Sequence, residues 1–213
     1  MSQYRGANPL PPLEPPYDRV TRYIDPHTGM VTAKLVPGQL FVGGARDCIT
    51  TVVGSCVTVC MYDASARCGG MLQFLLPFTV PGTLPARSQG GLDIPERLAF
   101  LALETLVTGL ESRGARRGTM RAKLFGAARV DPELADSSRD TIHRVRSYFR
   151  TERIVEDGAD TGLLQARKIV FHPGEGRVLI KKLGELANDT LPRREREYYE
   201  RVMARAGAGQ GNG

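Results

Sequence analysis

The sequence predicts an α+β protein, in which β-sheet layers pack against two or three helices. Segments with strand character outnumber helical ones, and most are joined by short turns rather than by helices. β-Branched residues are dense on both sides of Gly54 in "CITTVVGSCVTVCMYD" (residues 48–63), which is typical of two buried elements around a tight passage. Residues 93–114 carry the broad apolar face of an amphipathic helix.

Four further stretches have the composition of strands. "TAKLVPGQLFVGG" (32–44) is expected to form one strand or two, with an interruption at its Pro-Gly pair. "GGMLQFLLP" (69–77) is a short strand, and "TMRAKLFGAARV" (119–130) is a strand that runs into a Gly-Ala-Ala loop. "RKIVF" and "RVLIKKL" (167–171 and 177–183) indicate a closing hairpin around "HPGEG".

Two helices and a third, charged segment are predicted. The strongest helix, residues 93–114, begins with a capping box at Asp93 and stops at Gly114. "SSRDTIHRVRSYFRTER" (137–153) has apolar residues on one face and is expected to start from a serine N-cap. The segment after Asp189 is charged and helix-like.

The chain of 213 residues is expected to hold one folded domain between two flanking segments. Residues 1–32 are proline-rich and are expected to be irregular. The domain spans residues 33–188, and residues 189–213 form a charged helical segment with a flexible tail. No apolar run approaches the ~20 residues that span a bilayer, and no secretory signal is found. We therefore expect a cytoplasmic protein without membrane insertion.

Lys and Arg number 29 and Asp and Glu number 23, which gives a formal net charge of +6. Much of the excess is arginine, in "ESRGARRGTMRAK" and "PRREREYYERVMARA". A basic surface can bind nucleic acid or an acidic protein. Aromatic residues do not interleave with the basic ones to make a stacking surface, so we expect solvated charged faces and no nucleic-acid partner.

The cysteines Cys48, Cys56, Cys60 and Cys68 lack the CxxC spacing of a zinc site, so no metal is expected. In the cytoplasm they are expected to be reduced thiols. Cys56 differs from the others because it follows a Gly-Ser pair between two apolar runs.

Cys56 could be a nucleophile or a small core residue. A nucleophilic cysteine needs a nearby imidazole, cation or helix N-terminus to lower its ordinary pKa of ~8.5. It also needs oxyanion donors, which backbone N–H groups of a tight Gly-Ser-Cys turn can supply. From the residues alone the core cysteine is the commoner interpretation, and both remain open.

"TTVVGSCVTVCMYD" followed by "GGMLQFLLP" resembles the two signature blocks of the CheD family, the chemoreceptor glutamine deamidases. The likeness continues through the long helix, "RAKLFGAARV", the "EDGADTG" loop and the hairpin, over roughly residues 35–183. The resemblance implies an α+β fold similar to the catalytic domain of cytotoxic necrotizing factor. It implies hydrolysis of glutamine amides on methyl-accepting chemotaxis receptors, without a cofactor, and binding of a CheC-like phosphatase.

The resemblance places the family's nucleophile on Cys56 and its threonine on Thr50. The family's histidine falls on Gln73, which can make hydrogen bonds but cannot accept a proton near neutral pH. A second departure is "FGAAR", where the family usually has another glycine after the first. Loss of the acid–base group would typically cost ~10²–10⁴ in rate.

The chain has three histidines that could replace the missing base. His27 lies in the irregular amino-terminal region, His143 on a predicted helix, and His172 at the start of the hairpin turn. A surface or turn role is the more common interpretation for each.

Two hypotheses follow. In the first, the chain is a working glutamine deamidase that acts through a Cys56 thioester. In the second, it is a catalytically weak or inactive CheD-like protein that binds receptors or a CheC-like phosphatase. Nucleic-acid binding has only charge in its favour. A Cys56 sulfur closed off from solvent would contradict the first hypothesis.

Overall fold

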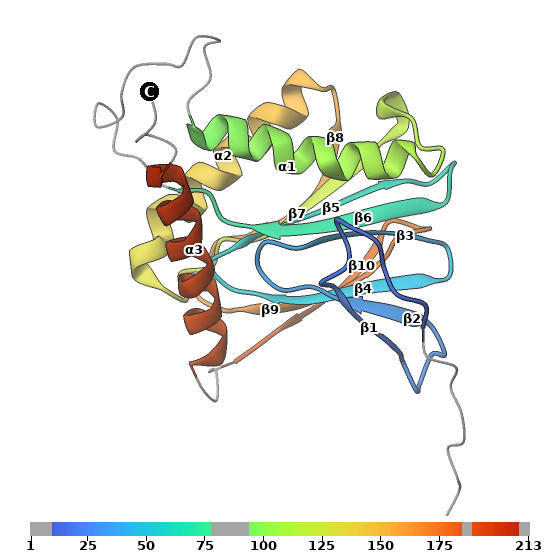
Figure 1. Cartoon of the computed structure of the whole chain (residues 1–213), viewed down its shortest axis with the longest axis horizontal. Helices are drawn as coiled ribbons and strands as arrows, with labels where there is room; N and C mark the ends of the chain where they lie inside the picture. Colours follow the sequence, from blue (N-terminus) through green and yellow to red (C-terminus); the bar gives the residue numbers. More distant parts are fainter. Residues whose placement is uncertain (1–9, 78–93, 185–188, 209–213) are drawn as a thin grey trace, which may run out of the picture.

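The structure, a computed structural model, describes residues 10–77, 94–184 and 189–208. Over these residues the chain forms two five-stranded sheets stacked face to face, with helices on the outer side of one of them (Figure 1). Helices α1 (Ile94–Glu111) and α2 (Ala135–Thr151) make up that helical layer. The predicted α+β class is confirmed.

The first sheet has the strand order β1-β2-β4-β9-β10. Strands β2 and β4 are parallel, and the other neighbours are antiparallel. The last two strands form the predicted hairpin. The strands are β1 (Thr21–Ile24), β2 (Val31–Lys34), β4 (Asp47–Val53), β9 (Arg167–His172) and β10 (Arg177–Lys182).

The second sheet has the order β3-β6-β5-β7-β8, and its outer face lies under α1 and α2. Only β7 and β8 run parallel within it. The strands are β3 (Leu40–Gly44), β5 (Val57–Asp63), β6 (Cys68–Phe74), β7 (Arg121–Gly126) and β8 (Val155–Thr161).

Residues 54–56, here called the crossing turn, carry the chain from β4 in one sheet to β5 in the other. The predicted tight passage is therefore present. The loop after β7 fixes it, because the N–H groups of Ala127 and Ala128 donate to the carbonyls of Cys56 and Gly54, each at 2.8 Å.

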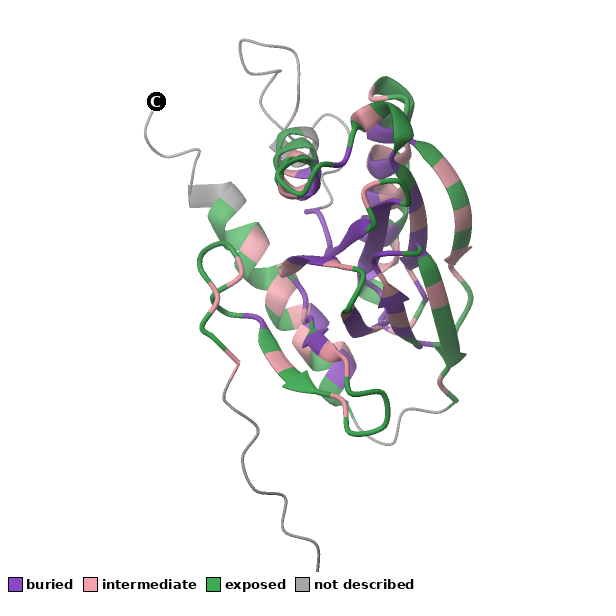
Figure 2. Cartoon of the chain, turned by 90° about the vertical axis from the view of Figure 1, so that its right-hand side faces the viewer, coloured by how far each residue is buried: buried purple, intermediate pink, exposed green. Residues whose placement is uncertain are grey.

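Buried side chains form two clusters, one between the sheets and one between the second sheet and the helices. Figure 2 marks the buried residues in purple along the ribbon. Strand β5 is buried along its whole length and faces both clusters in alternation. We call the cluster between the sheets the inter-sheet core; its members include Leu35, Ile49, Val53, Cys56, Cys60 and Phe171.

The expectation that residues 1–32 are irregular does not hold for their last part. Strand β1 and the first residues of β2 lie there and pair antiparallel at the edge of the first sheet. Three of the four β1 residues are exposed, so no apolar alternation marked the strand in the sequence. Strand β1 forms because its backbone hydrogen-bonds to β2, and this pairing leaves no pattern in the local sequence.

Two other expectations are corrected. "EDGADTG" was expected to be a loop, but most of it lies in β8, which pairs with β7 despite its glycine and acidic residues. The N-cap of α2 is Leu134 rather than a serine, and Ser137 and Ser138 lie buried in the first turn.

Two other helix predictions are confirmed. Gly114 has φ +90° just after α1 and ends it as expected. The charged segment after Asp189 forms α3 (Thr190–Ala208). Asp93 and residues 209–213 lie outside the described residues. Within the described part of the chain, no helix is both long and apolar enough to cross a bilayer.

Gly126 should be intolerant of any side chain. It has φ +96°, and a Cβ there would run into the carbonyl oxygen of Cys56 and lie 2.7 Å from Cγ2 of Val53. We expect Gly126→Ala to lower the free energy of unfolding by about 2–5 kcal/mol, since left-handed strain and overpacking add.

Gly114→Ala is the matched control. Its φ is also positive, but none of the described residues lies within 4 Å of the added Cβ, so only the strain of about 1–2 kcal/mol should appear. Urea unfolding of both variants measures the difference. Equal losses would contradict the packing argument.

Candidate functional site

The crossing turn directs three consecutive backbone N–H groups at one carboxylate. Oε1 of Glu195, in α3, accepts from Gly54 at 2.8 Å and from Cys56 at 3.2 Å. Oε2 accepts from the N–H of Ser55 at 2.7 Å. Successive N–H groups that converge in this way make an anion-binding site.

The Cys56 thiol lies against the same carboxylate and is fully buried. Burial first, and then the Glu195 carboxylate, raise the pKa of this thiol well above its ordinary value. Burial also raises the pKa of Glu195, and the three N–H bonds oppose that rise only in part. With α3 in place, Cys56 is therefore a neutral thiol closed off from solvent. A sulfur closed off in this way contradicts the hypothesis of a working deamidase for the chain in this state.

Helix α3 supplies the cover. It runs past the strand ends of both sheets (Figure 1), and Tyr198 and Tyr199 pack against the inter-sheet core. The Ser137 hydroxyl of α2 donates to the phenol oxygen of Tyr199 at 2.9 Å. Arg196 binds the buried carboxylate of Asp131 at 2.7 Å. The element that closes the site is thus the segment that the sequence placed outside the folded domain.

Ser55 is held from two sides. Its hydroxyl oxygen accepts the N–H of Asp131 at 3.1 Å. Its carbonyl accepts the hydroxyl of Ser138, at 2.7 Å. Sequence reasoning missed Ser138 because serines at the start of a helical pattern suggest an N-cap. An N-cap needs one serine, so the second of the two adjacent serines was the signal that could have indicated another role.

Gln73 and Cys56 lie on the same side of the second sheet. Gln73 pairs with Thr58 across β5 and β6, and Cys56 precedes Thr58 by two residues. The buried Gln73 carboxamide is held at both ends. Its Nε2 donates to the carbonyl of Val52 at 3.2 Å, and its Oε1 accepts the hydroxyl of Thr51.

Thr50 is turned away from this group. Its hydroxyl donates to the carbonyl of Ile169 at 2.8 Å, across the β4–β9 pair. Side chains alternate along a strand, so Thr50 faces away from the inter-sheet core while Thr51 faces into it. The structure therefore brings Thr51, not the side chain of Thr50, to Gln73.

No histidine is among the hydrogen-bonding or charged neighbours of Cys56. His27 and His143 are exposed, and His172 is half-buried in the hairpin, where burial lowers its pKa. Among the described residues, no group of three or more His, Cys, Asp or Glu side chains could hold a metal ion.

The loop beside the crossing turn carries the second departure from the signature. Ala127 stands where another glycine was expected, and its φ is +51°. This left-handed conformation is strained for a residue with a Cβ. The preference for glycine at this position thus has a direct backbone cause.

Comparison with known proteins finds a matching family model and proteins of similar sequence. The family model "CheD chemotactic sensory transduction" matches residues 83–182. A protein of Halorhodospira halophila named "Probable chemoreceptor glutamine deamidase CheD" is 35% identical, over 93% of this chain and 91% of its own. A Dechloromonas aromatica protein named "Probable chemoreceptor glutamine deamidase CheD 1" is 36% identical, over 85% of this chain and 88% of its own.

One solved structure also matches. The DUF152-family protein NMB0706 of Neisseria meningitidis is 11% identical, with a TM-score of 0.40 over 70% of this chain and 77% of its own.

Ala127→Gly should stabilise the protein. Relief of the left-handed strain, about 1–2 kcal/mol, exceeds the extra chain entropy that glycine loses on folding, about 0.5–1 kcal/mol. The neighbour Ala128 is buried without a positive φ, so Ala128→Gly should destabilise by about 1 kcal/mol. Thermal unfolding of both variants is the measurement, and a loss of stability in both would contradict the assignment.

Cys56 should resist alkylation in the folded chain. Its raised pKa means that less thiolate is present at pH 8 than in an unfolded cysteine, and each pKa unit removes about tenfold. With burial added, iodoacetamide should react about 100-fold or more slowly than in urea. Peptide mass spectrometry follows each site, and Cys48, at 6% exposure, should label before Cys56. Equal rates for Cys56 in folded and unfolded chains would contradict the closed site.

Proposed function

We propose, from the premise that this chain belongs to the CheD family, that it is a chemoreceptor glutamine deamidase of the cytoplasm. Its substrates would be glutamines of methyl-accepting chemotaxis receptors. The observation that carries the proposal is the crossing turn, where a thiol and three backbone N–H groups surround one carboxylate. A glutamine amide has the same shape as that carboxylate.

In the proposed reaction, the Cys56 sulfur attacks the amide carbon and gives up its proton. The carbonyl oxygen becomes an oxyanion, which the N–H groups of Gly54 and Cys56 stabilise. The C–N bond then breaks, the nitrogen takes up a proton and leaves as ammonia, and a thioester remains. Water hydrolyses the thioester to a glutamate carboxylate and restores the thiol.

The weak point of this reaction is proton transfer. Gln73 stands at the family's histidine position, and its carboxamide cannot take the thiol proton. The hydrogen bonds from Thr51 and to Val52 hold it in one orientation, so it can polarise neighbouring groups. We propose that Thr50 serves by tying β4 to β9 through its hydroxyl.

A specific observation favours the second hypothesis as an alternative. With α3 in place, Cys56 is a neutral thiol closed off from solvent and has no imidazole among its hydrogen-bonding or charged neighbours, as expected for a weak or inactive member of the family. A working deamidase therefore requires α3 to move off the crossing turn. Such a protein would bind receptors or a CheC-like phosphatase without turnover. The two functions differ in ammonia release and share receptor binding.

Activity should depend on Cys56 and rise when the missing base is supplied. We expect Cys56→Ala to abolish release of ammonia from a co-expressed receptor. We expect Gln73→His to raise the rate by about 10²–10⁴, because it restores a group that can carry the proton. Mass spectrometry of receptor peptides identifies each converted glutamine.

Cys60→Ala is the control, since Cys60 is equally buried in β5 and faces the same core. It should leave the rate unchanged. Deamidation that persists in Cys56→Ala would contradict the thioester route. If neither the natural chain nor Gln73→His deamidates the receptor, and both still bind it, the result would favour the binding protein.

A further inference from the structure

The carboxylate bound by the crossing turn belongs to Glu195, a glutamate on helix α3. Deamidation of a glutamine on a substrate helix would leave the same group, a glutamate on a helix. Resting on the proposed function, we infer that α3 occupies the docking surface of the substrate helix. Glu195 then takes the place of the substrate's glutamine side chain. The chain blocks its own site with a copy of its product.

The contacts of the two carboxylate oxygens match that role. Oε1, which accepts two N–H groups, lies where the carbonyl oxygen of a glutamine would need stabilisation. Oε2, which accepts the N–H of Ser55, lies where the amide nitrogen departs and the oxygen of water arrives. A carboxylate satisfies all three donors, whereas the NH₂ of a glutamine would face the Ser55 N–H donor to donor. The product form therefore binds this turn better than the substrate form.

The attachment of α3 suits a displaceable element. Only Leu191 and Glu195 are buried among its described side chains, four residues apart on one face. Tyr198 continues that face and covers Gly38. The other contacts of α3 come from the partly buried Tyr198 and Tyr199 and from the ion pair of Arg196, and a competing helix that supplies similar contacts can replace it.

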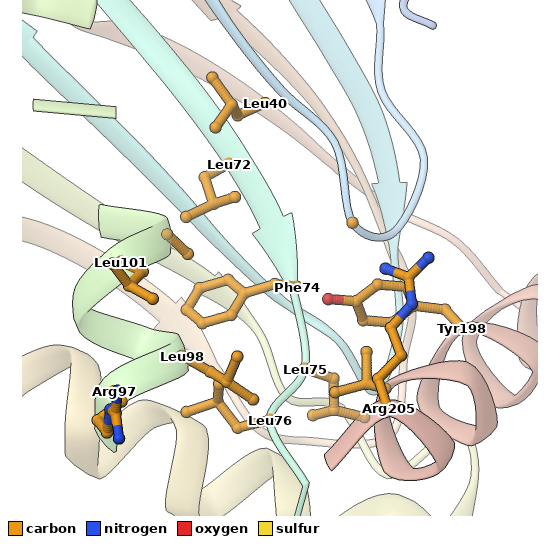
Figure 3. Close-up of a pocket in the computed structure, with 13 residues that line it drawn as sticks. Leu40, Leu72, Phe74, Leu75, Leu76, Arg97, Leu98, Leu101, Tyr198 and Arg205 are labelled. Atoms are coloured by element: carbon orange, nitrogen blue, oxygen red, sulfur yellow. The ribbon is translucent and has the colours of Figure 1, made fainter. Parts of the chain in front are cut away.

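The surface beneath α3 is larger than α3 itself fills. A cavity of about 680 Å³ lies between the later half of α3, α1 and β6 (Figure 3). Its walls are mainly apolar, with Phe74 on β6, Leu98 and Leu101 on α1, and Tyr198 on α3. A longer or bulkier amphipathic helix would bury apolar side chains there that α3 does not supply.

Contacts beside Glu195 give the expected pattern of the partner helix. Arg196 pairs with Asp131, whose side chain is only 3% exposed, and with Glu133. Tyr198 covers the turn at Gly38. A substrate helix that repeats these contacts has a basic residue directly after the glutamine and an aromatic residue three positions after it.

Glu195 could instead be the missing base, since it lies against the Cys56 thiol. The geometry favours the product copy. Both of its oxygens occupy the N–H groups that the substrate oxygen needs, so it cannot serve as base while substrate is bound.

The first experiment makes the chain its own substrate. In the full chain carrying Gln73→His, Glu195→Gln places a glutamine in the crossing turn. Peptide mass spectrometry should show its conversion to glutamate over time. Glu197→Gln, at an exposed position of the same helix, should stay unconverted. Adding Cys56→Ala to Glu195→Gln should stop the conversion, which excludes spontaneous deamidation.

The second experiment does not need turnover. In the Cys56→Ala chain, a recombinant helical-hairpin fragment of a methyl-accepting chemotaxis receptor is titrated and its Kd measured. Adding Glu195→Ala should tighten binding tenfold or more, because the closed state no longer competes. Glu197→Ala should leave the Kd unchanged. Circular dichroism confirms that each variant is folded, and Glu195→Gln, which keeps the side chain's size, serves as the second variant.

The outcomes distinguish failure of the inference from failure of the proposed function. Receptor deamidation with no conversion at position 195 and an unchanged Kd overturns the inference and leaves the function. Tighter binding of the receptor fragment, with no deamidation by any variant, supports the docking surface and contradicts the proposed deamidase function. Loss of receptor deamidation in Glu195→Ala, with an unchanged Kd, overturns the inference and identifies Glu195 as a base.

Discussion

Strands β4 and β5 follow one another in sequence but lie in different sheets, so neither ladder pairs the N–H groups between them. Three buried donors at residues 54–56 then need an acceptor from elsewhere, because an unpaired buried N–H group costs about 1–3 kcal/mol. The Glu195 carboxylate satisfies all three. The shape of the crossing turn, the setting of Cys56 and the position of α3 all follow from this need.

Local pattern was enough for the elements whose residues carry their own signal. The strands around Gly54, the closing hairpin and α1 were predicted because apolar spacing and turn residues are short-range features. The docking of α3 was not predictable in this way. Its contact with the crossing turn is made by a glutamate, a residue type that is almost never buried unless paired, and the residues of that turn precede it by about 140 positions. The sequence also did not show which of Thr50 and Thr51 points into the inter-sheet core. The pairing of β4 with β9, a strand far away in sequence, decides this.

The surroundings of Gln73 explain how the site keeps its form without the family's histidine. The carboxamide uses one donor, toward Val52, and one acceptor, toward Thr51. A neutral imidazole also offers one donor and one acceptor. The two side chains can therefore satisfy the same buried partners, and the exchange alters proton chemistry far more than packing. Shape and catalytic capacity at this position are separable properties.

The closure over Cys56 also affects the chemical lifetime of its sulfur. Peroxide attacks thiolates that it can reach, and the first product is a sulfenic acid. A fully buried thiol that keeps its proton meets neither condition. The resting chain would consequently outlast oxidative stress with its sulfur reduced, and damage would fall mainly on molecules caught open.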